Sequence, residues 1–425
     1  MIKSSICNLL RILLIGVMIL FAGCQKNGNE NESGKKVTDI TFLTPLSGAD
    51  GSYMDKIIQG FNEANPDIKV SHFVVEQSTE YKQKLSTGVS SGSAPEVVLI
   101  RKFDMPLYFD QFEEIPIEDL MNHGIDTNDI YPNLLSGLER ENSILGIPLD
   151  VWIFYMAYNR ANFLEAGLDP DNPPINREEF VADMKALKRI TPKGVTPYYE
   201  DLTWGWIWAH LLWQFGGDFL SEDFKSPAFK EKGVEVIKFL MQLQEEGIIP
   251  DTVVDAGPAF ESGDSSVLIT GVWTINAWYE LFGSDFGYAA APQLGSTQSV
   301  FGGSHIIALT KDGNADPIKR EASMRWVKYL WDHMLDWYRA GQTPSRISIA
   351  ESDELKEQLP LIWTVAQQVP YVKSFQMFPY ISEVQDEISV YLQSALLTKE
   401  LSPEEAMEKA SEAVQYVLDD YWAMQ

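Results

Sequence analysis

The chain has 425 residues, of which 45% are apolar and 22% are charged. A chain of this length exceeds one ordinary core, so we expect two lobes or domains, and its composition is that of a soluble globular protein. The formal net charge of −28 argues against a nucleic-acid partner.

Residues 1–23 are predicted to be a secretory signal peptide. Lys3 and Arg11 precede the apolar run ILLIGVMILFAGC at 12–24, which gives the basic start and short apolar centre of such signals. The run is shorter than a typical membrane span. Cys7, one of two cysteines, would leave with this segment, so we expect no internal disulfide.

The end of this segment is similar to a bacterial lipobox. Ala22 and Gly23 directly precede Cys24, although Phe21 stands where the motif prefers a smaller aliphatic residue. The resemblance implies cleavage before Cys24 and a lipid on its thiol, which would anchor the protein on the outer face of the cell membrane. A plain signal peptide and an uncleaved anchor are the alternatives. The polar residues that follow, within 24–37, predict a flexible tether.

The region after the tether alternates strands with helices. Apolar runs predict strands at 37–46, 68–75 and 94–100, with helices at 51–64 and 78–92 between them. This alternation predicts an α/β fold with a largely parallel sheet.

The second half of the chain continues the alternation. A long apolar strand and two helices are expected within 144–190, and another helix at 227–246. Further strands are predicted within 285–295 and 299–310, and the chain from about residue 317 is predicted to be mostly helical.

Four tryptophans crowd the segment WGWIWAHLLWQFGGD at 204–218. At about 100° per residue, Trp204 and Trp208 lie near one face of a helix, whereas Trp206, His210 and Trp213 lie near the opposite face. One face can pack on a core while the other meets a ligand, or all four rings can be core.

Several stretches follow one another in a recognisable order: FNEANPDIKV, SGSAPEVVLI, GIPLDVWIFYMAYNRANFLEAGLDPDNPP, WQFGGD, ITGVW, FGGSH, AGQTPSR and LSPEEAMEKA. Taken together, they resemble the carbohydrate-type extracellular solute-binding proteins of ABC importers, the relatives of maltose-binding protein. The resemblance covers residues 38–425.

This resemblance implies a two-lobe fold of the periplasmic-binding-protein type, with a ligand cleft between lobes that close by hinge motion. We expect an N-terminal lobe of 38–149 and 304–350, and a C-terminal lobe of 150–303 and 351–425. A receptor of this kind delivers a sugar to permease subunits in the membrane. We expect it to be a monomer without a cofactor or metal.

The resemblance also implies which aromatic rings meet the ligand. Trp206, with Trp204 beside it, takes the place of an aromatic residue that stacks on a sugar ring, and Trp273 resembles the stacking aromatic of the second lobe. Trp208 and Trp213 are assigned to the core. Burial of all these rings is the alternative.

Other candidates lie on loops near the expected cleft. Trp152 falls where relatives place a cleft residue, with hinge packing as the alternative. Phe103 and Asp104 follow a strand at the carboxyl end where α/β proteins bind ligands, though Asp104 can also be a solvated loop acid. Ser47 follows the first strand, and Tyr81 lies at the start of the next helix.

The chain recrosses between the lobes at Gly303, Ser304 and His305, where glycine would let a ligand approach the backbone, or would simply form a tight turn. Arg346 follows in a loop and can bind hydroxyls or a carboxylate through its guanidinium group, or remain exposed.

Two other functions remain open from the sequence. The same fold can bind another solute, such as a polyamine, a peptide or a phosphodiester. A secreted glycoside-processing enzyme would also be rich in aromatic residues and would use two carboxylates. The five histidines lie at positions 72, 123, 210, 305 and 333, without the spacing of a metal site.

Overall fold

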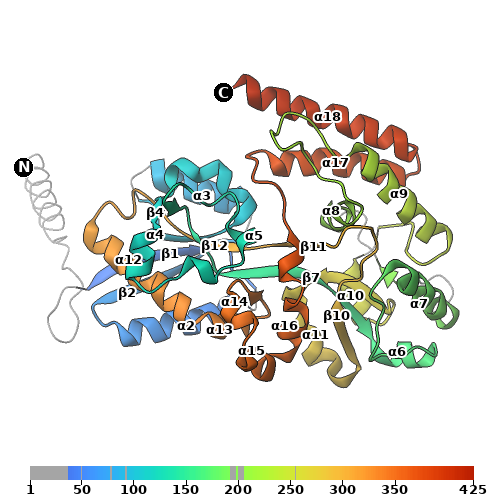
Figure 1. The fold of residues 1–425 in the computed structure, drawn as a ribbon, viewed down its shortest axis with the longest axis horizontal. Coiled ribbons are helices and arrows are strands. Elements are labelled where there is room, and N and C mark those ends of the chain that lie inside the picture. Colours follow the sequence, from blue (N-terminus) through green and yellow to red (C-terminus); the bar gives the residue numbers. More distant parts are fainter. Residues whose placement is uncertain are drawn as a thin grey trace, which may run out of the picture.

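The computed structural model describes residues 37–48, 50–76, 79–90, 93–191, 198–199, 205–253 and 255–425. The predicted signal peptide, the predicted lipid site at Cys24 and Trp204 lie outside the described residues. Figure 1 shows two groups of elements side by side, each built around its own sheet. Within the described residues, no helix has the length and apolar character needed to cross a membrane.

The first sheet has the strand order β2-β1-β3-β12-β6. Its strands are β1 (Thr38–Thr44), β2 (Ile68–Val74), β3 (Val97–Arg101), β6 (Ile147–Pro148) and β12 (His305–Leu309). The strands β2, β1 and β3 are parallel, whereas β12 pairs antiparallel with both β3 and β6. The last part of this sheet therefore comes from a segment far along the chain.

Helices cover both faces of the first sheet. Phe42 of β1 packs edge-on against Trp326, whose ring also meets Phe61, so α2 (Gly51–Ala64) and α12 (Pro317–Asp332) share one core. Residues of the opposite face, including Leu43, form a second core with α3 (Thr79–Ser90). The period-2 alternation of β1 thus supplies both cores.

Shorter elements complete the first group. They are η1 (Lys102–Gln111), β4 (Ile115–Pro116), α4 (Ile117–Asn122), η2 (Thr127–Asp129), α5 (Pro132–Leu135), β5 (Ser143–Ile144), α13 (Met334–Tyr338) and α14 (Ile347–Ala350).

The second sheet has the order β14-β11-β7-β9-β8, and β10 and β13 also pair with β7. Its strands are β7 (Asp150–Asn159), β8 (Tyr198–Tyr199), β9 (Val267–Gly271), β10 (Phe286–Ala290), β11 (Val300–Gly303), β13 (Thr343–Pro344) and β14 (Val372–Lys373). All four partners of β7 run antiparallel to it. The prediction of a largely parallel sheet from the first strands of the chain is therefore confirmed for β2-β1-β3. The second sheet is mixed, because β14 pairs parallel with β11 and β8 pairs parallel with β9.

The second group carries most of the remaining helices. These are α6 (Arg160–Glu165), α7 (Arg177–Ile190), α8 (Gly205–Gln214), α9 (Lys230–Glu245), α10 (Ala256–Glu261), η3 (Val272–Thr274), α11 (Ile275–Phe282), η4 (Gly283–Asp285), α15 (Asp353–Gln358), α16 (Pro360–Ala366), η5 (Val369–Tyr371), α17 (Ile381–Leu396) and α18 (Pro403–Ala423). Helices α17 and α18 pack together and against α9, at the upper right of Figure 1.

Three stretches of chain join the two groups. Leu149 alone separates β6 from β7, and β7 runs into the second group, as the long central arrow in Figure 1 shows. Ser304 alone separates β11 of the second sheet from β12 of the first. Strand β13 pairs with the first two residues of β7. The junction is therefore where side chains from both groups can meet.

Candidate functional site

A cluster of aromatic rings lies at this junction. Trp152 stacks on Trp206 with their ring centroids 5.3 Å apart, and Trp273 lies 6.2 Å from Trp152 and 6.5 Å from Trp206. Phe103, from the first group, meets Trp152 and Trp206 edge-on at 6.4 Å. The structure thus brings together four of the predicted residues, which come from η1, β7, α8 and η3.

The three indole rings of this cluster border a cavity of about 310 Å³, and Phe103 packs behind two of them. The lining residues of the cavity are Asp50, Arg101, Trp152, Trp206, Trp273, His305 and Gln342. Three indole faces beside a few polar groups are typical of small-molecule sites, where the apolar wall binds and the polar groups orient.

His305 is held in place by a buried carboxylate. The backbone N–H of His305 donates to Asp150 Oδ1 at 3.0 Å, and Nδ1 lies 3.0 and 2.9 Å from the two carboxylate oxygens. Trp337 Nε1 also donates to Asp150, at 2.9 Å. Because Nδ1 is engaged, Nε2 is the polar atom of His305 that remains for a solute.

The same contacts set the protonation of His305. Burial of the ring lowers its pKa, but the charge of Asp150, the hydrogen bond that the ring donates to Asp150 and the charge of Asp50 outweigh burial and raise the pKa above its usual 6.5. Burial likewise raises the pKa of Asp50, against the opposing charge of His305. Asp50 also accepts from the N–H of Gly51 at the start of α2.

Asp104 acts on the site through Arg101. Its carboxylate accepts from Arg101 Nε at 2.9 Å and lies 3.4 Å from Lys82 Nζ. The Arg101 guanidinium also lies 4.7 Å from the ring centroid of Phe103. Asp104 is therefore not a solvated loop acid, and it does not line the cavity. It positions Arg101, which does line the cavity.

Two glycines let indole rings lie on the backbone. A Cβ at Gly303 would stand 2.2 Å from Cζ2 of Trp152, and a Cβ at Gly271 would stand 1.9 Å from Cζ3 of Trp273. Any larger residue would displace either ring. The predicted residue Gly303 thus contributes by making room for Trp152, whereas its neighbour Ser304 is buried and lies outside the cavity wall.

The burial of the tryptophan rings on helix α8 follows the assignment made from the sequence. Trp206 is half-buried beside the cavity, while Trp208 and Trp213 are buried as predicted. Trp213 stacks on Phe301, which also packs against Trp206. Phe301 is fixed in turn because its N–H donates to the buried His210 at 3.1 Å. Burial lowers the pKa of His210 to about 3, so this ring is neutral.

Three predicted residues lie away from the cavity. Tyr81 is 0% exposed, in the core beneath α3, and its hydroxyl donates to the carbonyl of Leu99. Arg346 pairs with Asp129 at 2.7 Å and lies over the ring of Trp331. Ser47 is exposed, outside the cavity wall. The polar atoms of Tyr81 and Arg346 are thus engaged with Leu99 and Asp129, away from the cavity.

The cavity also includes residues that the sequence did not single out. Asp50 and Arg101 lie within three residues of the predicted Ser47 and Phe103, so the loops were correct but the side chains were not. Gln342 lies inside the quoted stretch AGQTPSR, four residues before Arg346. Proximity to a predicted residue was the only signal for each of them.

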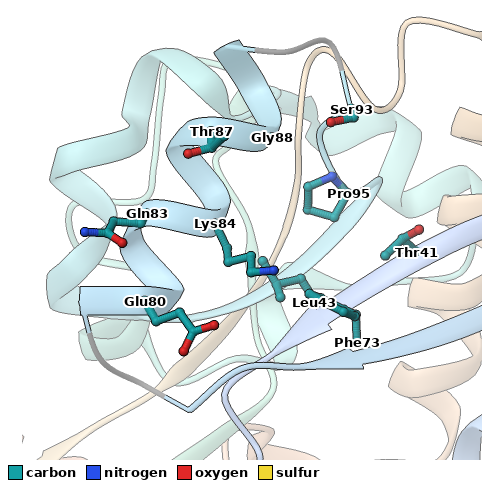
Figure 2. Close-up of a pocket in the computed structure, with 10 residues that line it drawn as sticks. All are labelled: Thr41, Leu43, Phe73, Glu80, Gln83, Lys84, Thr87, Gly88, Ser93 and Pro95. Atoms are coloured by element: carbon teal, nitrogen blue, oxygen red, sulfur yellow. The ribbon is translucent and has the colours of Figure 1, made fainter.

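A larger hollow, of about 880 Å³, lies on the flank of the first sheet. Figure 2 shows its lining residues, with Lys84 reaching from α3 toward Leu43 and Phe73. Only the first group of elements borders it, and no described residue of its wall has a buried polar atom without a partner. The aromatic cavity is therefore the better candidate for a solute site.

Similar proteins have been described. The chain matches 28% of 191 residues in the sn-glycerol-3-phosphate-binding periplasmic protein UgpB of Shigella flexneri, a match that spans 41% of this chain and 40% of the relative. The chain thus spans well under half the length of these curated relatives.

Solved structures show the same fold. A cyclic alpha-maltosyl-1,6-maltose binding protein from Arthrobacter globiformis superimposes with a TM-score of 0.77 at 22% identity, over 90% of this chain and 100% of that one. The sugar-binding protein MalE from Xanthomonas citri gives 0.79 at 17% identity, over 91% and 99%. UgpB from Mycobacterium tuberculosis, in complex with glycerophosphocholine, gives 0.75 at 18%, over 90% and 99%.

These likenesses confirm the two-lobe α/β fold that the sequence predicted. A family model for bacterial extracellular solute-binding proteins matches residues 46–331, which is more than half of the chain. The protein therefore belongs to the bacterial extracellular solute-binding protein family.

Proposed function

We propose that this protein is the receptor of an ABC importer and binds a sugar or oligosaccharide outside the cytoplasmic membrane. The observation that carries the proposal is the cavity bordered by Trp152, Trp206 and Trp273. A sugar ring offers a C–H face that packs on an indole, while its hydroxyls reach polar atoms at the edge. Structural neighbours named for maltose and related sugars support the same class of ligand.

The charges around the cavity favour a neutral solute. Asp50 and Arg101 line the wall with opposite signs, and the raised pKa of His305 favours its protonated form, which faces the carboxylate of Asp150 behind it. A polyamine would need an excess of carboxylates, and a phosphodiester an excess of cations. Neither excess is present among these four residues.

A phosphate ester of glycerol is the second candidate, because the curated relatives are named for binding sn-glycerol 3-phosphate and one structural neighbour holds glycerophosphocholine. Arg101 is the residue that would meet a phosphate. However, Arg101 already donates to Asp104, so binding an anion would mean sharing this cation.

A glycoside-processing enzyme has less support. A pair of catalytic carboxylates must both reach the substrate, but Asp150 is fully buried and accepts from His305 and Trp337. Asp50 is thus the carboxylate that lines this cavity. The stretch GVSSG at 88–92 has the spacing of a nucleophile elbow, but Gly88–Ser90 end helix α3 and do not follow a strand.

We also propose that the two lobes, 38–149 with 304–350 and 150–303 with 351–425, close on the solute and then meet permease subunits. A lipid on Cys24 would hold the receptor on the membrane, and the tether would raise its concentration near the permease. Cys24→Ala should abolish labelling by a radioactive fatty acid; equal labelling of this variant would exclude the anchor.

A thermal-shift screen tests the ligand. The protein is heated with maltose, maltotriose, sn-glycerol 3-phosphate, glycerophosphocholine or spermidine, and stabilisation rises with ligand concentration over Kd. We expect the largest shift from a saccharide. A shift from spermidine alone, or from a glycerol phosphate ester alone, would replace the sugar proposal. Release of product from a saccharide would indicate an enzyme.

A further inference from the structure

Two buried polar atoms in the cavity wall have no hydrogen-bond partner. Trp152 and Gln342 are 3% and 2% exposed, and Trp152 Nε1 and Gln342 Oε1 are both unpartnered. Both residues line the same cavity. Buried polar groups are nearly always paired in folded proteins, so two exceptions at one cavity call for a partner that comes from outside the chain.

Strand pairing explains why these two side chains share a wall. In the β13–β7 ladder, Thr343 lies opposite Val151 and Pro344 opposite Asp150. Continued by one residue, this antiparallel register sets Gln342 opposite Trp152. Residues directly opposite each other in an antiparallel pair point to the same face of the sheet. The backbone therefore fixes a donor and an acceptor side by side at the junction.

The two atoms need different hydrogen-bond partners, one an acceptor and the other a donor. An indole N–H can only donate, and an amide oxygen can only accept. A hydroxyl group does both, so neighbouring hydroxyls of a sugar can satisfy the two atoms together. A protonated amine can only donate and would leave Trp152 Nε1 unpaired, whereas a fully ionised phosphate can only accept and would leave Gln342 Oε1 unpaired.

We propose that Trp152 Nε1 and Gln342 Oε1 recognise hydroxyl groups of the solute and thereby select a polyhydroxylated ring over a polyamine or a phosphate group. This inference rests on the proposed function and names the atoms that determine its specificity. Trp152 then has two roles, because its ring also forms part of the aromatic wall.

The test separates binding from folding. Gln342→Met keeps the length of the side chain and removes the acceptor, and Trp152→Phe keeps a ring and removes the N–H. Ser323→Ala is the matched control, because Ser323 Oγ is also buried without a partner but lies in α12, away from the cavity. The full-length chain, purified in detergent, is titrated with maltose and maltotriose by calorimetry, and its urea midpoint is measured without ligand.

We expect Gln342→Met to weaken saccharide binding by roughly tenfold to a hundredfold, as loss of a partner for a buried polar group does, with an unchanged or higher urea midpoint. Monodeoxy sugars make the test more specific. One of them should bind wild type more weakly than the parent sugar does, and it should bind wild type and Gln342→Met with equal affinity. Ser323→Ala should bind like wild type.

Unchanged saccharide affinity in Gln342→Met would overturn the inference. It would also be overturned if Gln342→Met lost affinity together with a lowered urea midpoint and Trp152→Phe bound saccharide normally. The ligand controls separate this result from the proposed function. If only glycerophosphocholine or sn-glycerol 3-phosphate binds, and Gln342→Met weakens that binding, recognition of hydroxyls stands and the sugar function falls. If spermidine binds tightly, or if none of the probes binds, both the inference and the proposed function are overturned.

Discussion

At the scale of the residue, Trp273 and Trp208 show how the surroundings of a ring decide its role. Trp273 is 41% exposed beside the cavity, and Trp208 is 4% exposed. Trp208 packs edge-on against Phe219 and Phe229 in the second group. A ring left open to water is available to a ligand, whereas an enclosed ring contributes its buried area to folding.

Substituting these two rings should therefore have opposite effects. Trp273→Ala should weaken ligand binding by about 1–3 kcal/mol, roughly tenfold to a hundredfold, with little change in the free energy of unfolding. Trp208→Ala should cost about 3–5 kcal/mol of folding through a core cavity. Urea unfolding without ligand and calorimetry with it measure both quantities. Loss of folding in Trp273→Ala with normal binding would reverse this assignment.

His305 should make stability depend on pH. Its folded pKa is raised by Asp150 and Asp50 in spite of burial. The folded state therefore binds the proton more tightly than the unfolded state does. The resulting stabilisation is fully present below the unfolded pKa of 6.5 and is lost as pH rises through the folded pKa.

Urea unfolding at intervals from about pH 5.5 to pH 9 measures this effect, with His305→Gln as the control that cannot titrate. We expect wild type to lose stability relative to the variant across this range. Parallel curves for the two proteins would show that the ion pair contributes nothing.

Much of the aromatic wall could be predicted from the sequence, because Trp residues are large and few and lie in recognisable stretches. The polar members could not. Asp50 lies on a turn, Arg101 ends strand β3 and Gln342 directly precedes strand β13, and at such element ends the direction of a side chain depends on tertiary contacts. Tyr81 lies at the helix start that the sequence predicted, but its hydroxyl donates to the Leu99 carbonyl in the core.

At the scale of the element, strand β11 shows how register builds the site. Gly303 lies opposite Trp152 and Gly302 opposite Ile153. The sequence predicted a strand in this region and the longer strands β1, β2, β3, β7 and β10, because apolar runs are local signals. It could not predict which strands pair antiparallel with β7, since these segments lie more than 100 residues away.

A methyl group at Gly303 tests this register. Gly303→Ala should drive the Trp152 ring from its place, and overpacking of this kind typically costs about 1–3 kcal/mol of folding. Ligand affinity should fall as well, since Trp152 borders the cavity. Gly257→Ala is the control, because no atom lies within 4 Å of a Cβ at Gly257. If Gly303→Ala matches Gly257→Ala in both its free energy of unfolding and its ligand affinity, strand β11 does not confine the Trp152 ring.

At the scale of the whole molecule, the two groups of elements touch beyond the three stretches of chain that join them. Phe103 of the first group packs on Phe375 of the second at 5.4 Å. Asn133 Nδ2 donates to the carbonyls of Val369 and Val372 at 3.1 and 3.3 Å. Such contacts between lobes set how often the cleft is closed before a solute arrives.

Removing the Asn133 contacts should therefore shift the balance toward an open form. Asn133→Ala loses two hydrogen bonds between the lobes, each worth about 0.5–1.5 kcal/mol net, so its affinity should fall by about tenfold because closure costs more. Small-angle scattering should show a larger radius of gyration for this variant than for wild type without ligand, and the same compact value for both at saturating ligand.

Asn62→Ala is the matched control, since Asn62 also donates to a carbonyl, that of Val70, but within the first group. This control should unfold more easily than wild type and yet have the same radius of gyration. A wild-type profile that ligand leaves unchanged would mean a rigid, preformed site, and an Asn133→Ala profile equal to wild type without ligand would mean that this contact does not govern closure.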